Sequence, residues 1–184
     1  CALLADPSLA AAPEVRASER PLSSASEPSP VDLVLTADES RLITANQVAN
    51  TLSLVDLASG AVVDEVPCGE RPTSVAITPD DQKVLATATF SGELLVFALS
   101  DDDFQPAGAM QLGFEPRGIA ISPDGELAYV ALTTADTVAV VDIDRMEVVA
   151  RIAVGRWPRY LALSPDGKRL AVGCNGDRGV SIVD

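Results

Sequence analysis

The chain has 184 residues, enough for a sizeable core, and its 27 acidic against 13 basic residues give a formal net charge of −14. It contains no histidine, which excludes Ser-His-Asp and Cys-His nucleophile systems and histidine-ligated haem, copper or zinc within these residues. The acidic surplus disfavours a nucleic-acid partner, because it would repel a phosphate backbone. No apolar run reaches the roughly 20 residues of a membrane span, so no transmembrane segment is expected.

Residues 1–30 differ from the rest of the chain. They are rich in Ala, Ser, Pro and Glu, show no strand period, and are predicted to form a poorly ordered tail. Three interpretations fit: the end of a signal peptide cut near Ala10, a lipoprotein acylated at Cys1, or a linker at an arbitrary truncation point. The first two indicate a secreted or periplasmic protein, lipid-anchored through Cys1 in the second case.

From residue 31 onward a repeat organises the chain. Its landmarks are spaced 42, 44 and 42 residues apart: Pro30, Pro72, Pro116 and Pro158, and likewise Asp38, Asp80, Asp124 and Asp166. Within the unit 117–158, four short apolar runs at 119–121, 128–132, 138–141 and 148–154 are separated by turn residues. No window shows the helical period. Four strands in about 42 residues is the size of one β-propeller blade.

The repeat predicts an all-β chain of four-stranded antiparallel blades. Their expected bounds are 31–72, 73–116, 117–158 and 159–184, the last ending after its third strand, so about 3.75 blades are present. Stacked blades need neighbours on both faces. We therefore expect a fragment of a longer propeller, with further blades or an appended domain following on the C-terminal side.

The units resemble the YVTN-family β-propeller repeat. Residues 120–125 and 162–167 match its A-[VI]-[ST]-P-D-G segment, Ile43-Thr44-Ala45-Asn46 is close to the naming tetrapeptide, and Tyr129-Val130-Ala131-Leu132 keeps its start. The resemblance covers residues 31–184 and implies a seven-bladed ring. It implies no single activity, since similar propellers occur as lactonase-like enzymes and joined to haem-binding domains.

Neither the cysteines nor the acidic residues predict a catalytic or metal site. Without a C-x-x-C pair there is no zinc knuckle, redox dithiol or covalent haem attachment, and Cys68 and Cys174 are expected to be small core residues. The run 101–103 is more typical of a solvated turn than of a calcium site. The periodic Asp38, Asp80, Asp124 and Asp166 are expected to cap equivalent turns. No cofactor, metal or catalytic residue is assigned.

Charge patterning indicates which rim binds a ligand. In a propeller, the loops joining the fourth strand to the next first strand share a rim with the second-to-third turns. This rim collects five basic and five acidic residues: Glu70, Arg71, Glu93, Glu115, Arg117, Asp136, Arg156, Arg159, Asp177 and Arg178. The opposite rim collects fifteen carboxylates between Asp38 and Asp184 against five basic residues: Arg41, Lys83, Arg145, Lys168 and Arg169.

The first rim also holds Phe90, Phe114 and the only tryptophan. Arginine and aromatic side chains anchor many binding surfaces, and arginine suits carboxylate or phosphate. The candidate ligand-binding residues at the mouth of the central channel are therefore Arg71, Arg117, Arg156, Trp157 and Arg159. Alternatively, these arginines brace neighbouring loops and Trp157 packs between blades.

The sequence favours a non-catalytic binding or interaction scaffold in a secreted or periplasmic β-propeller protein. Its expected partner is a protein or an anionic small molecule, of unknown identity. The alternative is the propeller portion of a redox enzyme with a linked haem domain, or of a lactonase-like enzyme, whose catalytic groups lie outside this segment. A C-x-x-C-H sequence downstream would favour the redox alternative.

Overall fold

The computed structural model describes residues 29–100 and 102–184; the tail predicted for residues 1–30, including Cys1 and Ala10, lies outside them except for its last two residues. The described chain forms fifteen strands. Blade one comprises β1 (Pro30–Leu35), β2 (Arg41–Asn46), β3 (Thr51–Asp56) and β4 (Ala61–Pro67). Blade two comprises β5 (Pro72–Ile77), β6 (Lys83–Ala88), β7 (Glu93–Leu99) and β8 (Phe104–Gln111). Blade three comprises β9 (Pro116–Ile121), β10 (Leu127–Leu132), β11 (Thr137–Asp142) and β12 (Glu147–Ala153). Blade four comprises β13 (Pro158–Leu163), β14 (Leu170–Cys174) and β15 (Gly179–Val183).

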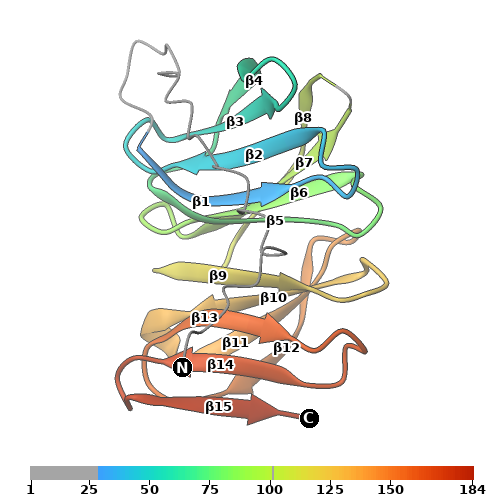
Figure 1. Cartoon of the computed structure of the whole chain (residues 1–184). Coiled ribbons are helices and arrows are strands. Elements are labelled where there is room, and N and C mark those ends of the chain that lie inside the picture. Colours follow the sequence, from blue (N-terminus) through green and yellow to red (C-terminus); the bar gives the residue numbers. More distant parts are fainter. Residues whose placement is uncertain (1–28, 101) are drawn as a thin grey trace, which may run out of the picture.

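Each strand pairs antiparallel with the next along the chain, giving three four-stranded sheets and one three-stranded sheet. The predicted fold class is therefore confirmed: an all-β propeller with about 3.75 blades. Figure 1 shows the sheets following one another, from blade one near the top to blade four at the bottom. The one helix within the described residues is the single 3₁₀ turn η1 (Thr133–Ala135), and none of them forms a helix long and apolar enough to cross a membrane.

The core lies between successive sheets. Val, Leu, Ile and Ala from blades one and two form one buried cluster, blades two and three form a second, and blades three and four a third. Such small side chains fit sheets that are covered on both faces. Cys68 and Cys174 are buried and free, as expected, and burial raises the pKa of the Cys68 thiol to about 12. The Cys68 thiol is therefore not a reactive thiolate at neutral pH.

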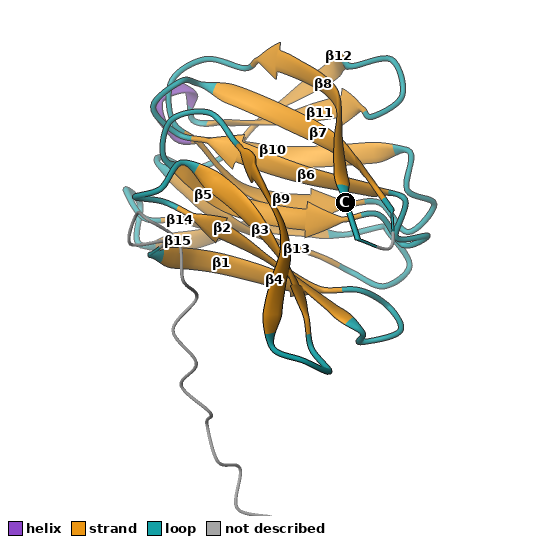
Figure 2. Ribbon diagram, turned by 90° about the horizontal axis from the view of Figure 1, so that it is seen from above, coloured by secondary structure: helices purple, strands orange, loops and turns teal. Residues whose placement is uncertain are grey.

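The first strand of every blade lies at the centre of the arc. Neighbouring inner strands approach within 8 Å between Cα atoms, β1 beside β5, β5 beside β9 and β9 beside β13, and Figure 2 shows them from above. Hydroxyls fix these strands to the preceding blade: Thr89 Oγ1 donates to the Pro116 carbonyl (3.1 Å) and Thr133 Oγ1 to the Pro158 carbonyl (2.9 Å). The inner strands therefore form one wall.

Each inner strand contains a β-bulge directly after its first residue, a proline. The pairing skips Val31 in β1, Thr73 in β5 and Arg159 in β13. In β9 the pairing passes from Pro116 to Ile119, so the irregularity there covers both Arg117 and Gly118. A bulge re-aims the side chain of the extra residue, so all four side chains can turn toward the channel.

Candidate functional site

A cavity of about 280 Å³ lies against the wall of inner strands. It is lined by the bulged residue and the next residue of each strand: Val31, Asp32, Thr73, Ser74, Arg117, Gly118, Arg159 and Tyr160. Each pair directly follows the proline that begins its strand. The repeat and the bulge together therefore gather eight residues from four blades into one site.

Arg117 and Arg159 are the two cations of this channel cavity. In the described residues, the Nε atom of each is buried and has no hydrogen-bond partner. An Nη atom of Arg117 lies 3.7 Å from a Glu115 carboxylate oxygen. Both Nε atoms are closed to solvent, so any donor that these guanidinium groups offer to a ligand in the channel comes from their Nη groups.

Gly118 lies where the backbones of β9 and β13 come close. A Cβ atom at Gly118 would lie 2.5 Å from the Arg159 carbonyl oxygen and 3.3 Å from the Tyr160 Cα. Only a glycine lets β9 and β13 approach this closely without a backbone shift.

Asp32 is the carboxylate of the cavity and links β1 to β5. Its Oδ2 accepts hydrogen bonds from the Ser74 hydroxyl (2.8 Å) and the Val75 amide (3.0 Å), and its Oδ1 accepts one from the Leu33 amide (3.0 Å). The lining thus combines two guanidinium groups with one carboxylate and the hydroxyl groups of Thr73, Ser74 and Tyr160. It carries a positive balance within a strongly acidic chain.

The other three predicted site residues lie outside the cavity, in loops of the rim. The Arg71 guanidinium stacks on Phe90, 4.6 Å from the ring centroid, and an Nη atom donates to Gln47 Oε1 (3.1 Å). Arg156 Nε pairs with Asp177 Oδ1 at 2.9 Å, and this hydrogen bond raises the pKa of Arg156 and lowers that of Asp177. Both arginines brace neighbouring loops.

Trp157 lies beside Arg156 on the rim. Its amide donates to Asp136 Oδ1 (2.9 Å), its φ is +57°, and its side chain is 56% exposed. It therefore does not pack between blades. The structure brings Arg117 and Arg159 together in the channel and leaves Arg71, Arg156 and Trp157 outside it.

The four periodic aspartates occupy equivalent turns on the opposite rim. Each carboxylate accepts from the Thr or Ser hydroxyl two residues earlier and the amide two residues later; in Asp38 these are Thr36 (2.7 Å) and Ser40 (2.9 Å). The same hydrogen bonds lower the pKa of Asp80, Asp124 and Asp166, and lower that of Asp38 to about 2. The contacts are those of turn-capping groups.

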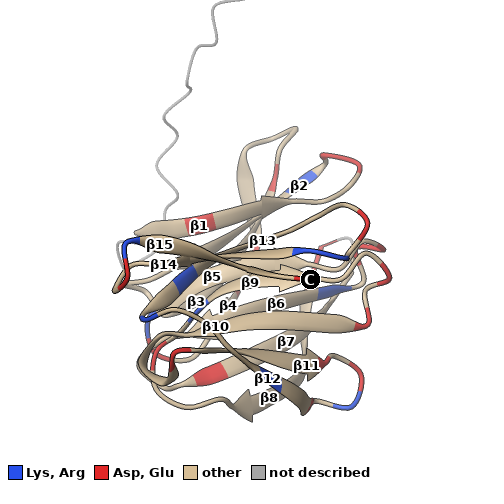
Figure 3. Cartoon of the chain, turned by 90° about the horizontal axis from the view of Figure 1, so that it is seen from below, with Lys and Arg blue, Asp and Glu red and all other residues tan. Residues whose placement is uncertain are grey.

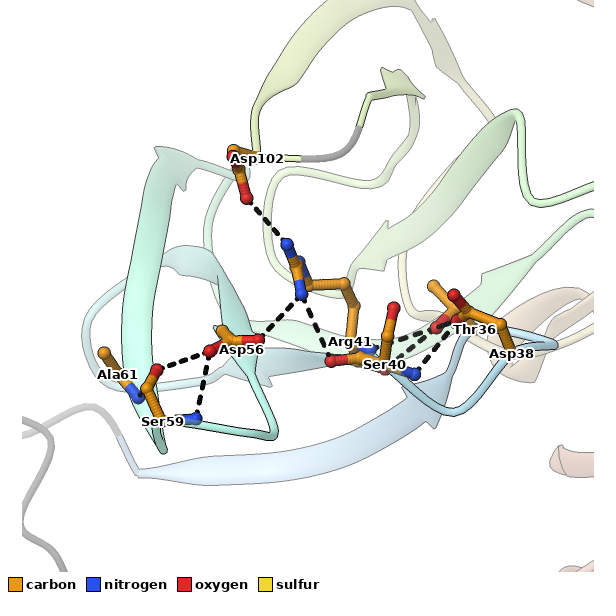
Figure 4. Close-up of polar contacts among 8 residues, drawn as sticks. All are labelled: Thr36, Asp38, Ser40, Arg41, Asp56, Ser59, Ala61 and Asp102. Carbon is orange, nitrogen blue, oxygen red and sulfur yellow. Dashed lines mark hydrogen bonds and ion pairs between the residues drawn. The ribbon is translucent and has the colours of Figure 1, made fainter.

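A second cavity, of about 710 Å³, lies on the opposite rim between blades one and two. Figure 4 shows its central residue: Arg41 pairs through Nη1 with Asp56 Oδ1 and through Nη2 with Asp102 Oδ1, both at 2.8 Å. The two contacts tie Asp102 of blade two to blade one. Figure 3 shows the acidic and basic residues concentrated in such turns, with most of the strand surface carrying neither. No group of three or more Cys, Asp or Glu among the described residues is placed to hold a metal ion.

Antiparallel blades around a channel with a ligand-sized cavity define a β-propeller binding protein or enzyme. Residues 59–149 and 118–184 match the family described as lactonase, 7-bladed beta-propeller, and the chain belongs to this family. Its blades account for just over half of a seven-bladed ring. A search among curated proteins found no matching sequence.

Solved structures agree with the fold. The Kuenenia stuttgartiensis hydrazine synthase is 31% identical, with a TM-score of 0.79 over 85% of this chain and 46% of that chain. A putative 6-phosphogluconolactonase from Bacteroides uniformis is 16% identical, with a TM-score of 0.75 over 83% of this chain and 49% of that one. The periplasmic gluconolactonase of Pseudomonas aeruginosa is 21% identical, with a TM-score of 0.70 over 83% and 49%. This chain therefore spans about half the length of the proteins it resembles.

Proposed function

We propose that the chain is part of a binding propeller whose channel holds a small anionic ligand through Arg117 and Arg159. The observation that carries the proposal is that two arginines and only one carboxylate, Asp32, line the same cavity. Guanidinium groups present paired N–H donors that match carboxylate and phosphate oxygens. The hydroxyl groups of Thr73 and Ser74 and the carboxylate of Asp32 suit a ligand that carries hydroxyl groups beside its anion.

The size of the cavity supports a small molecule. At about 280 Å³ it lies just below the range for drug-sized ligand pockets, about 300–1,000 Å³, which suits a small ligand. Arg71, Arg156 and Trp157 then belong to the outer surface around the mouth of the channel, where a protein partner is the other candidate ligand of the scaffold.

The test is binding of 6-phosphogluconate and gluconate, measured by titration calorimetry. Arg117→Ala and Arg159→Ala each weaken binding at least tenfold, because each removes a charge-assisted contact of about 1.5–3 kcal/mol. Lys168→Ala and Arg169→Ala, on the opposite rim, are the matched controls and change binding less than twofold. Equal losses in both pairs would reject the site.

Lactone hydrolysis is the second candidate function, favoured by the family and by the two gluconolactonase structures. Water opens the ring ester and yields a hydroxy acid, so the reaction is followed as proton release from glucono-δ-lactone above the spontaneous rate. Its catalytic groups would lie outside the channel residues described here, as would the haem domain of a redox enzyme. If proton release does not exceed the spontaneous rate, lactone hydrolysis is rejected and binding is the function that remains.

The proposal also covers the type of repeat, the N-terminal tail and the localisation of the protein. Its repeats are of the YVTN type, with residues 1–30 as a tail and residues 31–184 as blades of a larger ring. The protein is secreted or periplasmic, which the likeness to a periplasmic gluconolactonase supports.

A further inference from the structure

Three exposed aromatic side chains stand on the rim beside the channel. Phe90, Phe114 and Trp157 are 50%, 59% and 56% exposed. They lie in the β6–β7, β8–β9 and β12–β13 connections. We call them, with the arginines Arg71 and Arg156, the aromatic rim. Large exposed aromatic groups gathered on one side of a protein mark an interaction surface.

Hydrogen bonds between neighbouring loops hold these residues in one row. The Glu115 amide donates to the Thr89 carbonyl (3.2 Å), and Thr134 Oγ1 donates to the Phe114 carbonyl (2.8 Å). The Trp157 amide donates in turn to Asp136 (2.9 Å). The row is fixed before any partner binds, which lowers the entropic cost of binding.

The exposed charges of this rim differ from those of the rest of the molecule. Three arginines are exposed, Arg71, Arg156 and Arg178, against two exposed carboxylates, Glu70 and Asp177. The opposite rim is dominated by aspartate and glutamate. A segment that carries carboxylates is therefore repelled less by this rim than by the opposite one.

The chain itself enters the propeller on this rim. Ser29, the first described residue, accepts a hydrogen bond from the Gln47 amide (3.1 Å). Its φ is +46°, and it occupies the position directly before the first proline of its blade, as Arg71, Glu115 and Trp157 do in theirs. Residues 1–28 are therefore joined to the propeller at the surface that carries the aromatic side chains.

We propose that residues 19–28, ERPLSSASEP, bind across the aromatic rim of the same chain. Pro21, Leu22 and Pro28 supply the proline and apolar groups that aromatic surfaces recognise in extended segments. Glu19 and Glu27 supply carboxylates for the exposed arginines, and with Arg20 the segment has a formal net charge of −1.

Length and tethering favour this occupant. Ten residues in polyproline II span about 31 Å, and Ser29 is separated from Trp157 by three inner-strand spacings with Cα approaches within 8 Å. Residues 19–28 directly precede Ser29, so their binding to the rim is intramolecular and does not depend on protein concentration. A second copy docking rim to rim would instead bring like charges together.

The test uses the fluorescence of Trp157, the only tryptophan of the chain. Acrylamide quenching is compared between the 184-residue chain, a chain lacking residues 1–28, and the double variant Pro21→Ser, Leu22→Ser. Deletion and double variant each increase the quenching constant about twofold and shift the emission to longer wavelength. The matched control Leu3→Ser, Leu4→Ser leaves both unchanged, because it lies outside the binding segment. All of these changes fall outside the propeller strands, which far-UV circular dichroism checks.

A peptide of residues 19–28 provides the second arm. Added to the truncated chain it restores protection of Trp157, whereas the same peptide with Leu22→Ser does not. Equal quenching of the intact chain, the truncated chain and the double variant overturns the proposal. Protection of the intact chain that falls on dilution also overturns it, because an intramolecular contact is independent of protein concentration.

Discussion

Gly118→Ala should test whether close approach of β9 and β13 builds the channel site. The added Cβ would lie 2.5 Å from the Arg159 carbonyl oxygen, with two further backbone atoms within 3.4 Å. Because these are backbone atoms, no side-chain rotation relieves the contact, and the strands must separate by roughly 1 Å to reach ordinary contact distance. Overpacking of this kind costs about 1–3 kcal/mol.

Gly173→Ala is the matched control. Gly173 lies in β14, its φ is not in the left-handed region, and its added Cβ would meet no atom closer than 3.6 Å. Alanine there should be neutral or stabilise by about 0.4–1 kcal/mol, because it restricts the unfolded chain. Both variants add one methyl group to a glycine of a strand, so the difference between them reports the contact that the added Cβ makes.

The assay is urea unfolding followed by far-UV circular dichroism. Gly118→Ala should lower the free energy of unfolding by at least about 1 kcal/mol relative to Gly173→Ala. It should also weaken 6-phosphogluconate binding under conditions where it remains folded, since it displaces Arg159. Equal unfolding midpoints for the two variants would refute the inference that the glycine is needed for strand approach.

Two further predictions concern the core and the acidic turns. Leu54→Ala, at a fully buried position, should lower the free energy of unfolding by about 2–5 kcal/mol, whereas Leu57→Ala, 43% exposed, should change it by less than about 0.5 kcal/mol. Because the Thr36 hydroxyl lowers the pKa of Asp38 to about 2, against about 3.9 unfolded, its stabilisation is complete above about pH 4 and lost as the pH falls toward 2. Asp38→Asn should flatten this loss in acid-unfolding curves; Glu39→Gln, in the same turn, should not.

The blades were predictable from sequence because each repeat unit carries the same residues at the starts of its strands and in its turns. A proline at a fixed spacing, a capped turn and four β-branched runs define where each strand begins and ends, and the structure places strand starts at Pro72, Pro116 and Pro158. The missing helical period likewise predicted the near absence of helix. These features depend on residues that are close in the sequence, so they can be recognised without knowing which strands pair.

The division of the candidate site was not predictable in the same way. Trp157 and Arg159 are two residues apart, yet one stands on the rim and the other lines the cavity. The proline between them begins the strand, and the bulge that follows depends on pairing with β14. The residues around a bulge do not show which residues of the neighbouring strand will pair with them. For the same reason Asp32 was missed: its role arises from contacts with Ser74 and Val75 in the next blade.

The bulge also allows the residues that line the channel to differ between blades of the same backbone. The four copies agree at the proline, which fixes the start of the strand, and differ at the next residue: Val31, Thr73, Arg117 and Arg159. The bulged residue has no partner in the ladder of Cα pairs, so its side chain contributes little to the packing between strands 1 and 2 of its blade. The side chain can therefore change without altering the sheet, while its direction toward the channel stays the same. Two adjacent copies carry arginine, and this places the positive charge of the cavity on the side of blades three and four, opposite Asp32 of blade one. A ligand with an anionic end and hydroxyl groups at the other end would match this separation of charge.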